Sequence, residues 1–312
     1  MPPSPDAVPG LVLFSDTHDT LDIALRIISI LAPIVVIVGI GFWYGRKHDP
    51  EMSSANRLNM DVFVPALILG AMAGRDFEPG AYVKLAVAAG ALLLVCGALA
   101  RLVARPLQLP WRTFVPPMMF NNSANIGIPL AVLTWGEAAL PAAIVLYSVS
   151  NVLHFSLGVH MLDPHARLRT LWQHPTLVAI VTGLIISLLD IRLWPPLVEA
   201  LQMLGNVAVP LLLFALGVRM KHVDFNAVSI PLLSAVLRPV LGMCLAWVLG
   251  QALSLDARDS AMLLVFGALP PAVMNFLFAE RYQRDPHTVA AFVLVGNLAA
   301  VVMLPVALVL VL

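Results

Sequence analysis

Long apolar runs alternate with short polar connections from about residue 24 to the end of the chain. A helix rises about 1.5 Å per residue, so about 20 apolar residues cross the ~30 Å hydrocarbon core of a bilayer. Ten runs reach about this length, and the pattern therefore predicts an all-α polytopic membrane protein with ten transmembrane helices. The predicted spans are 24–44, 57–75, 81–103, 113–134, 138–161, 175–193, 197–219, 229–251, 259–280 and 287–311.

Two regions lie outside these runs. Residues 1–23 lack the basic start, apolar core and small-residue cleavage site of a signal peptide, so they are interpreted as an N-terminal extension. Residues 162–174 form a short basic linker.

Assigning Lys and Arg to the two sides of the predicted bilayer places twelve on one side and five on the other. This asymmetry predicts that the first side is cytoplasmic, with both termini on the outer side of a bacterial inner membrane.

Composition agrees with this class of protein. Of the 312 residues, 60% are hydrophobic and 12% are charged, and the formal net charge is zero, which gives no indication of a nucleic-acid partner. Both cysteines fall in apolar runs, so no disulfide is expected. The sequence contains no HExxH, GxSxG, phosphate-binding loop or metal-ligand spacing, and Ser123 with His154 lacks a nucleophile-elbow context. We therefore expect neither an enzyme nor a bound cofactor or metal.

One predicted span contains the polar stretch FNNSANIGIPLA (120–131). Proline removes a helix hydrogen bond and clashes with the preceding turn, so interruptions are predicted in two spans. Backbone groups freed in hydrocarbon need new partners, which asparagine and serine side chains can supply. Half-helices that resume there would present their positive N-terminal ends to a common point, which is suited to an anion. The predicted interruption residues are Gly127, Pro129, Pro270 and Pro271, and the predicted binding residues beside them are Asn122, Ser123, Asn125 and Asn275.

The two halves of the chain show a weak internal repeat. A shift of about 145 to 146 positions places Pro65 opposite Pro210 and Asn151 opposite Asn297. Each half would contain five spans, and an odd number makes the second half enter the membrane upside down. The sequence therefore predicts an inverted repeat of residues 24–161 and 175–312.

Four further polar residues lie inside predicted spans, and each has two interpretations. Arg238 could bind a substrate carboxylate, or it could join helices or extend its charged end to the interface. His154 could relay protons, or it could be a neutral histidine bonded to a carbonyl. Asn151 and Asn297 could bind substrate, or they could make ordinary hydrogen bonds between helices.

These motifs resemble those of a known family. NSANIGIP (122–129) resembles the fourth-span motif of the auxin efflux carrier family, which includes the plant PIN exporters and many bacterial carboxylate carriers. LPPAVMNFLFAERY (269–282) resembles the ninth-span motif, and the contexts of Pro65 and Pro210 resemble those in the second and seventh spans. The resemblance extends from about residue 24 to the end of the chain.

This resemblance implies a five-plus-five inverted fold of the kind found in bile-acid sodium symporters, with crossed broken helices in spans four and nine. It also implies a scaffold (24–75 and 175–219) and a transport domain (81–161 and 229–311) that moves against it in an elevator mechanism. A homodimer through the scaffold is expected. Family substrates are organic anions such as indole-3-acetate and malonate, but the short linker here differs from the long loop of the plant exporters and makes auxin a less favoured cargo.

The sequence therefore predicts a secondary transporter of small organic anions, with sodium or proton coupling left open. A channel, or an anion-binding membrane sensor that does not transport, is the alternative. Saturable exchange, macroscopic current, and binding without flux would distinguish these three functions.

Overall fold

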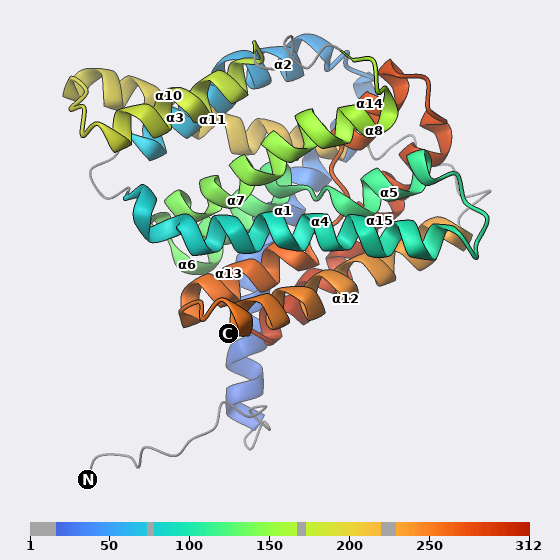
Figure 1. Ribbon diagram of the computed structural model, residues 1–312. Helices are drawn as coiled ribbons and strands as arrows, with labels where there is room; N and C mark the ends of the chain where they lie inside the picture. The colour runs from blue at the N-terminus through green and yellow to red at the C-terminus, as the bar shows by residue number, and fades with distance from the viewer. Residues whose placement is uncertain (1–16, 74–77, 167–172, 220–228) are drawn as a thin grey trace.

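A computed structural model describes residues 17–73, 78–166, 173–219 and 229–312. Most of the predicted N-terminal extension (1–23), part of the linker (162–174) and the end of the predicted span 57–75 lie outside the described residues. The regular elements in the described part are helical (Figure 1). They are α1 (Thr17–His48), α2 (Ser53–Leu58), α3 (Val64–Met72), α4 (Val83–Ala104), α5 (Trp111–Met119), α6 (Ile128–Trp135), α7 (Leu140–Leu153), α8 (Val159–Leu162), α10 (Pro175–Leu188), α11 (Pro195–Arg219), α12 (Ser229–Ala252), α13 (Ala257–Ala268), α14 (Met274–Arg281) and α15 (Pro286–Val309), with single 3₁₀ or π turns η1 (Asn59–Phe63), η2 (Pro79–Tyr82), η3 (Ser123–Gly127), η4 (Glu137–Ala139) and η5 (His154–Gly158).

Six helical segments in the described residues are long and apolar enough to cross a membrane. They are Leu21–His48, Pro79–Ala104, Glu137–Leu162, Pro195–Arg219, Ser229–Ala252 and Pro286–Val309. Helices also occupy the four other ranges predicted as spans, but these helices are shorter or interrupted. The all-helical class and several membrane-length helices are therefore confirmed, and the total of ten spans stays a prediction.

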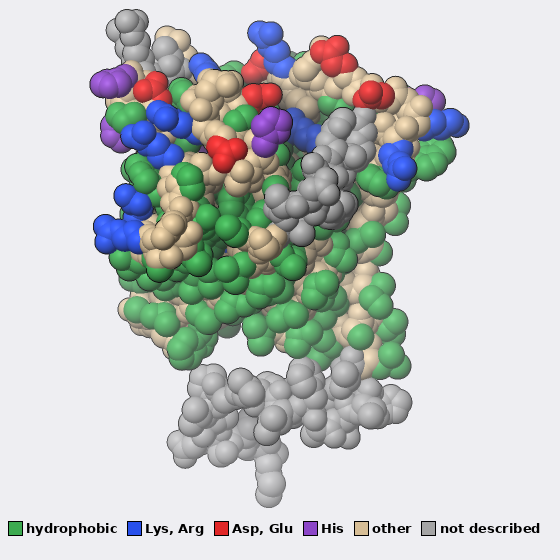
Figure 2. All heavy atoms as spheres, turned by 90° about the vertical axis from the view of Figure 1, so that its right-hand side faces the viewer, with side chains coloured by type: hydrophobic (Ala, Val, Ile, Leu, Met, Phe, Trp, Pro, Cys, Tyr) green, Lys and Arg blue, Asp and Glu red, His purple; other side chains and the backbone are tan. Residues whose placement is uncertain are grey.

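The outer surface suits a lipid environment. Large apolar side chains are exposed on the helices, such as Leu188 and Trp247, and on a connection between helices, such as Trp194. Figure 2 shows charged side chains gathered on the upper part of one face, above a lower part that is mostly hydrophobic. A surface this apolar indicates contact with hydrocarbon, because soluble monomers rarely expose large contiguous apolar areas.

The helices pack in two groups. Helix α11 packs against α1 and α3, and α3 packs against α10; helix α12 packs against α4, α13 and α15, and α4 packs against α5 and α7. Two very close approaches occur within these groups, and glycine makes both possible. A Cβ atom at Gly217 would collide with the Val38 carbonyl of α1, and one at Gly242 would collide with the Gly267 carbonyl of α13. Small residues of this kind let helix backbones approach closely in membranes.

Two helices are interrupted, and their interruptions meet. Between α5 and η3 the backbone is non-helical at residues 120–122, and between α13 and α14 it is non-helical at residues 269–273. Asn121 and Pro271 form an isolated antiparallel bridge. The Asn122 N–H donates to the Pro270 carbonyl at 2.8 Å, and the Ala272 N–H donates to the Phe120 carbonyl at 3.0 Å. Each interruption thus supplies hydrogen-bond partners for the backbone groups freed in the other.

The position of the first interruption differs from the prediction. Gly127 is the last residue of the π turn η3 and Pro129 lies in the first turn of α6, so the non-helical backbone ends at Asn122, before both residues. The π turn η3 explains how Pro129 is tolerated, because its wider turn relieves the clash between a proline ring and the carbonyl four residues before it. Pro270 and Pro271 do lie in the second interruption, as predicted.

Candidate functional site

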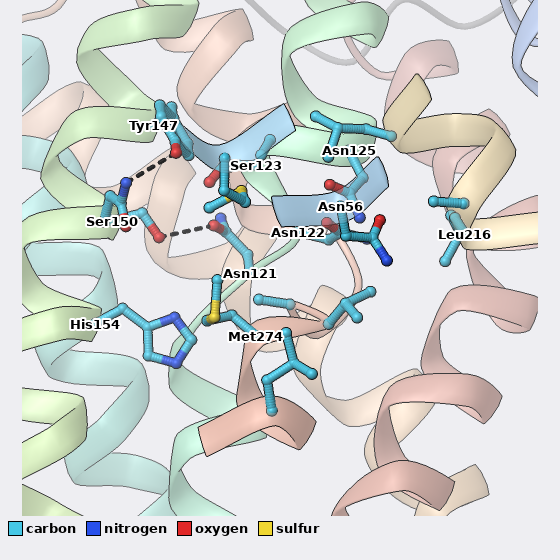
Figure 3. Close-up of a pocket in the computed structure, with 18 of the residues that line it drawn as sticks. Asn56, Asn121, Asn122, Ser123, Asn125, Tyr147, Ser150, His154, Leu216 and Met274 are labelled. Carbon is cyan, nitrogen blue, oxygen red and sulfur yellow. Dashed lines mark hydrogen bonds between the residues drawn. The ribbon is translucent and has the colours of Figure 1, made fainter. Parts of the chain in front are cut away.

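A cavity of about 110 Å³ lies beside the meeting point of the two interruptions. Side chains of α2, α7, α11, η3, η5 and α14 line it, together with residues of both interruptions. Figure 3 shows Ser123 and Asn125 at the cavity, with His154 on one side and Leu216 on the other. Residues from both halves of the sequence therefore enclose one space.

The cavity lies at the N-terminal ends of two half-helices. The first begins at Ser123 and the second at Met274, and neither has a side-chain cap. The N–H groups of Ile126 and Gly127 donate to the Asn122 carbonyl. The backbone N–H groups of Ser123, Ala124 and Asn125 have no acceptor within their own helix, because the first turn of a helix leaves its donors free. Their partial positive charge favours an anion at this place.

Several polar side chains that line the cavity are available to a ligand. Among the described residues, the side chains of Ser123, Asn125 and Asn56 make no hydrogen bond within the protein. The Asn151 amide nitrogen donates to the Tyr147 hydroxyl at 2.8 Å, and both residues also line the cavity. Hydroxyl and amide groups can donate to the oxygens of a bound acid.

Other predicted binding residues already have structural partners. Asn275 does not line the cavity, and its amide nitrogen donates to the carbonyls of Phe120 (3.1 Å) and Ala272 (3.0 Å). The Asn122 amide lines the cavity but donates to Asn297 Oδ1 at 2.8 Å. Asn297 in turn donates to the Pro271 carbonyl at 3.0 Å. These three asparagines join the interruptions to each other and to α15.

Arg238 and His154 occupy different environments. Arg238 does not line the cavity; it is 2% exposed and its guanidinium Nη1 donates to the Gly267 carbonyl at 3.3 Å, which joins α12 to α13. His154 does line the cavity, and its ring stacks on Phe120 with centroids 4.1 Å apart. Of these two residues, only His154 can contact a ligand in the cavity.

Sequence analysis missed several residues of the cavity. The missed residues are Asn56, Asn121 and Arg219. Asn56 lies one residue before the predicted span 57–75, and Arg219 is the last residue of the predicted span 197–219. Among the described residues that line the cavity, Arg219 is the only Lys or Arg. Its place at the end of a long apolar run was visible in the sequence, but its approach to η3 depends on how α11 packs.

The helices and the exposed apolar surface define an integral membrane protein, and the polar cavity at interrupted helices is typical of a transporter. Residues 165–308 match the family model described as "Membrane transport protein". A curated relative from Rhizobium meliloti (strain 1021), named "Putative malonate transporter", is 26% identical over 199 residues, which cover 58% of this chain and 61% of the relative. The match thus spans less than two thirds of that relative's length.

These matches confirm the resemblance to the auxin efflux carrier family of membrane transport proteins. They point to a transport protein and not to an enzyme.

Proposed function

We propose that this protein is a secondary transporter that binds a small organic anion in the cavity beside the two interruptions. The observation that carries the proposal is the convergence of two uncapped half-helix N-termini with the unpaired side chains of Ser123 and Asn125. Transporters commonly bind acidic substrates at half-helix ends near the middle of the membrane. Arg219 adds a positive charge to the lining.

The size of the cavity favours a short acid. An apolar cavity of about 150 Å³ can hold benzene. A cavity of about 110 Å³ therefore suits a three- or four-carbon carboxylate better than an indole acid. The similarity to a relative named as a malonate transporter supports the same substrate class.

The mechanism that we propose is an elevator. The packing of α1, α3, α10 and α11 into one group supports assigning 24–75 and 175–219 to a scaffold, and the packing of α4, α5, α7, α12, α13 and α15 supports assigning 81–161 and 229–311 to a transport domain. The cavity lies between these groups, since α11 contributes Leu216 while η3 and α14 contribute the half-helix ends. Ten spans, an inverted repeat, outward termini and a homodimer through the scaffold belong to the same proposal.

Transport by purified protein in liposomes tests this function. We expect uptake of labelled malonate or a related short acid to saturate, and internal unlabelled acid to accelerate it by exchange. Asn125→Ala should reduce uptake at least tenfold. The control is Asn206→Ala, which changes an exposed residue of α11 outside the cavity and should leave uptake unchanged. Current without saturation would instead indicate a channel, and binding without flux would indicate a sensor.

A further inference from the structure

A second cavity of about 520 Å³ runs along helix α1 on the side that faces α15. Its lining from α1 includes Leu31, Ile34, Val38 and Phe42, which recur at the spacing of one helix face, and ends at Arg46. At about 1.5 Å per residue, the segment from Leu31 to Arg46 is about 22 Å long. This length exceeds the ~15 Å of hydrocarbon in one leaflet of a bilayer.

The space along α1 is open down to the backbone. Gly39 lines this groove, and a Cβ atom added there would meet no heavy atom within 4 Å. By contrast, a Cβ atom at Gly41 would collide with the Phe214 carbonyl of α11. One face of α1 is thus tightly packed against α11, while the adjoining face leaves a trough.

The chemistry of the groove is that of an acyl chain with an anionic head group. Among the described residues that line it, Arg46 is the only charged one, and the others are apolar except for Asn297 and Gly39. The Arg46 guanidinium lies 5.7 Å from the centre of the Phe42 ring, at the end of the trough. Lys47 and His48 follow in the same last turn of α1.

We propose that this groove binds one anionic phospholipid, with an acyl chain along α1 and the phosphate at Arg46. An acyl chain already lies in hydrocarbon, so the apolar lining accommodates it by packing, and the interfacial cation attracts an anionic head group. A groove lined by helices of one chain, with a cation at the end of its α1 lining, is complementary to an acyl chain with an anionic head group.

The groove also adjoins the candidate substrate cavity. Leu216 lines both spaces, and Asn297, which lines the groove, accepts the hydrogen bond from Asn122 of the cavity. A lipid bound here would lie between α1 and α15, which belong to the two packing groups. The proposal holds whatever substrate the cavity binds.

Native mass spectrometry of the full chain tests this inference, with phosphatidylglycerol and phosphatidylcholine of identical acyl chains as probes. We expect the wild-type protein to retain phosphatidylglycerol about fivefold better than phosphatidylcholine. Arg46→Gln should lose this preference, and Gly39→Phe should lose most retention of either lipid. Lys47→Gln and Val36→Phe, which alter neighbouring α1 residues outside the groove lining, should behave as wild type.

Two results on lipid retention would each overturn the proposal. One is equal retention of both lipids by the wild-type protein, and the other is an undiminished preference for phosphatidylglycerol in Arg46→Gln. Because Arg46 is exposed, its substitution should not disturb folding, and it carries the test if Gly39→Phe proves unstable. A dimer of the wild-type protein that Gly39→Phe dissociates would also contradict the proposal, because a second copy of the chain would then occupy the groove.

Discussion

The side-chain amide of Asn122 donates to Asn297 Oδ1 at 2.8 Å, which ties the first helix interruption to α15. Asn297 uses its own amide nitrogen to bond the Pro271 carbonyl in the second interruption (3.0 Å) and the Val293 carbonyl within α15 (2.7 Å). A single buried side chain therefore connects three segments. The interruptions form a fixed structure at the edge of the cavity, and the ligand-binding groups lie on that structure.

Asn297→Asp should destabilise the protein more than it changes the chemistry of the cavity. The aspartate keeps an acceptor for Asn122 but has at most one donor, the O–H of a protonated carboxyl, in place of the amide N–H groups that bond Pro271 and Val293. Removing one partner of a buried hydrogen bond costs about 1–3 kcal/mol, so the melting temperature should fall by several degrees. Thermal unfolding of the purified variant, with Asn206→Ala as the exposed control, measures this effect. A melting temperature equal to that of the control would show that the bonds contribute nothing to stability.

Asn275→Ala and Asn125→Ala should have opposite effects. Asn275 bonds the Phe120 carbonyl outside the cavity, so its loss should lower stability by about 1–3 kcal/mol. Asn125 lines the cavity without an internal partner, so its loss should leave unfolding unchanged but weaken ligand binding by at least tenfold. Parallel unfolding and binding measurements on both variants distinguish the two roles. The assignment fails if Asn125→Ala loses stability and keeps its ligand.

Arg219→Gln should weaken binding of an acid, and Arg238→Gln should not. Arg219 lines the cavity, whereas Arg238 donates to the Gly267 carbonyl between α12 and α13. A partly exposed charge is screened by salt, so the affinity lost in Arg219→Gln should be largest at low ionic strength. Binding isotherms at low and high salt measure this difference. Loss of affinity in Arg238→Gln with unchanged stability would contradict the structural role.

His174, just before α10, should make stability depend on pH. Burial lowers the pKa of this imidazole, and the nearby Asp61 carboxylate partly opposes that shift. Since the unfolded chain then binds a proton more readily than the folded one, stability should fall as the pH drops below about 6.5. The melting temperature should therefore decline less between pH 7 and pH 5 in His174→Phe than in the wild type. His160→Phe, at an exposed position, is the control, and identical slopes for all three proteins would refute this origin.

Hydrophobic pattern predicted where the helices lie, because span length and apolarity depend on local sequence alone. Helices occupy the ranges expected, and α1 simply begins earlier, at Thr17. The interruption at Pro270 and Pro271 was predicted from proline, but the first interruption was placed too far along the chain. Whether a proline ring clashes with the preceding turn depends on the geometry of that turn. The π turn η3 removes the clash at Pro129, and the sequence alone does not show that this turn forms.

The candidate site was predicted only in outline for a related reason. Asparagines near an interruption can bond either the backbone or a ligand, and sequence does not separate the two uses. Asn275 and Asn297 bond the backbone, whereas Asn125 is left facing the cavity. Asn56 and Arg219 reach the same cavity from helices that become its neighbours only through tertiary packing.

The central claim is that a small organic anion binds where the two half-helices begin. Thermal stabilisation of the purified protein by malonate, malate, succinate, bile acids and indole-3-acetate tests it most directly, because a ligand raises the melting temperature by mass action. We predict stabilisation by a short carboxylate that is lost in Asn125→Ala and kept in Asn206→Ala. Stabilisation only by neutral or cationic solutes, or equal stabilisation of both variants, would contradict an anion site at this cavity.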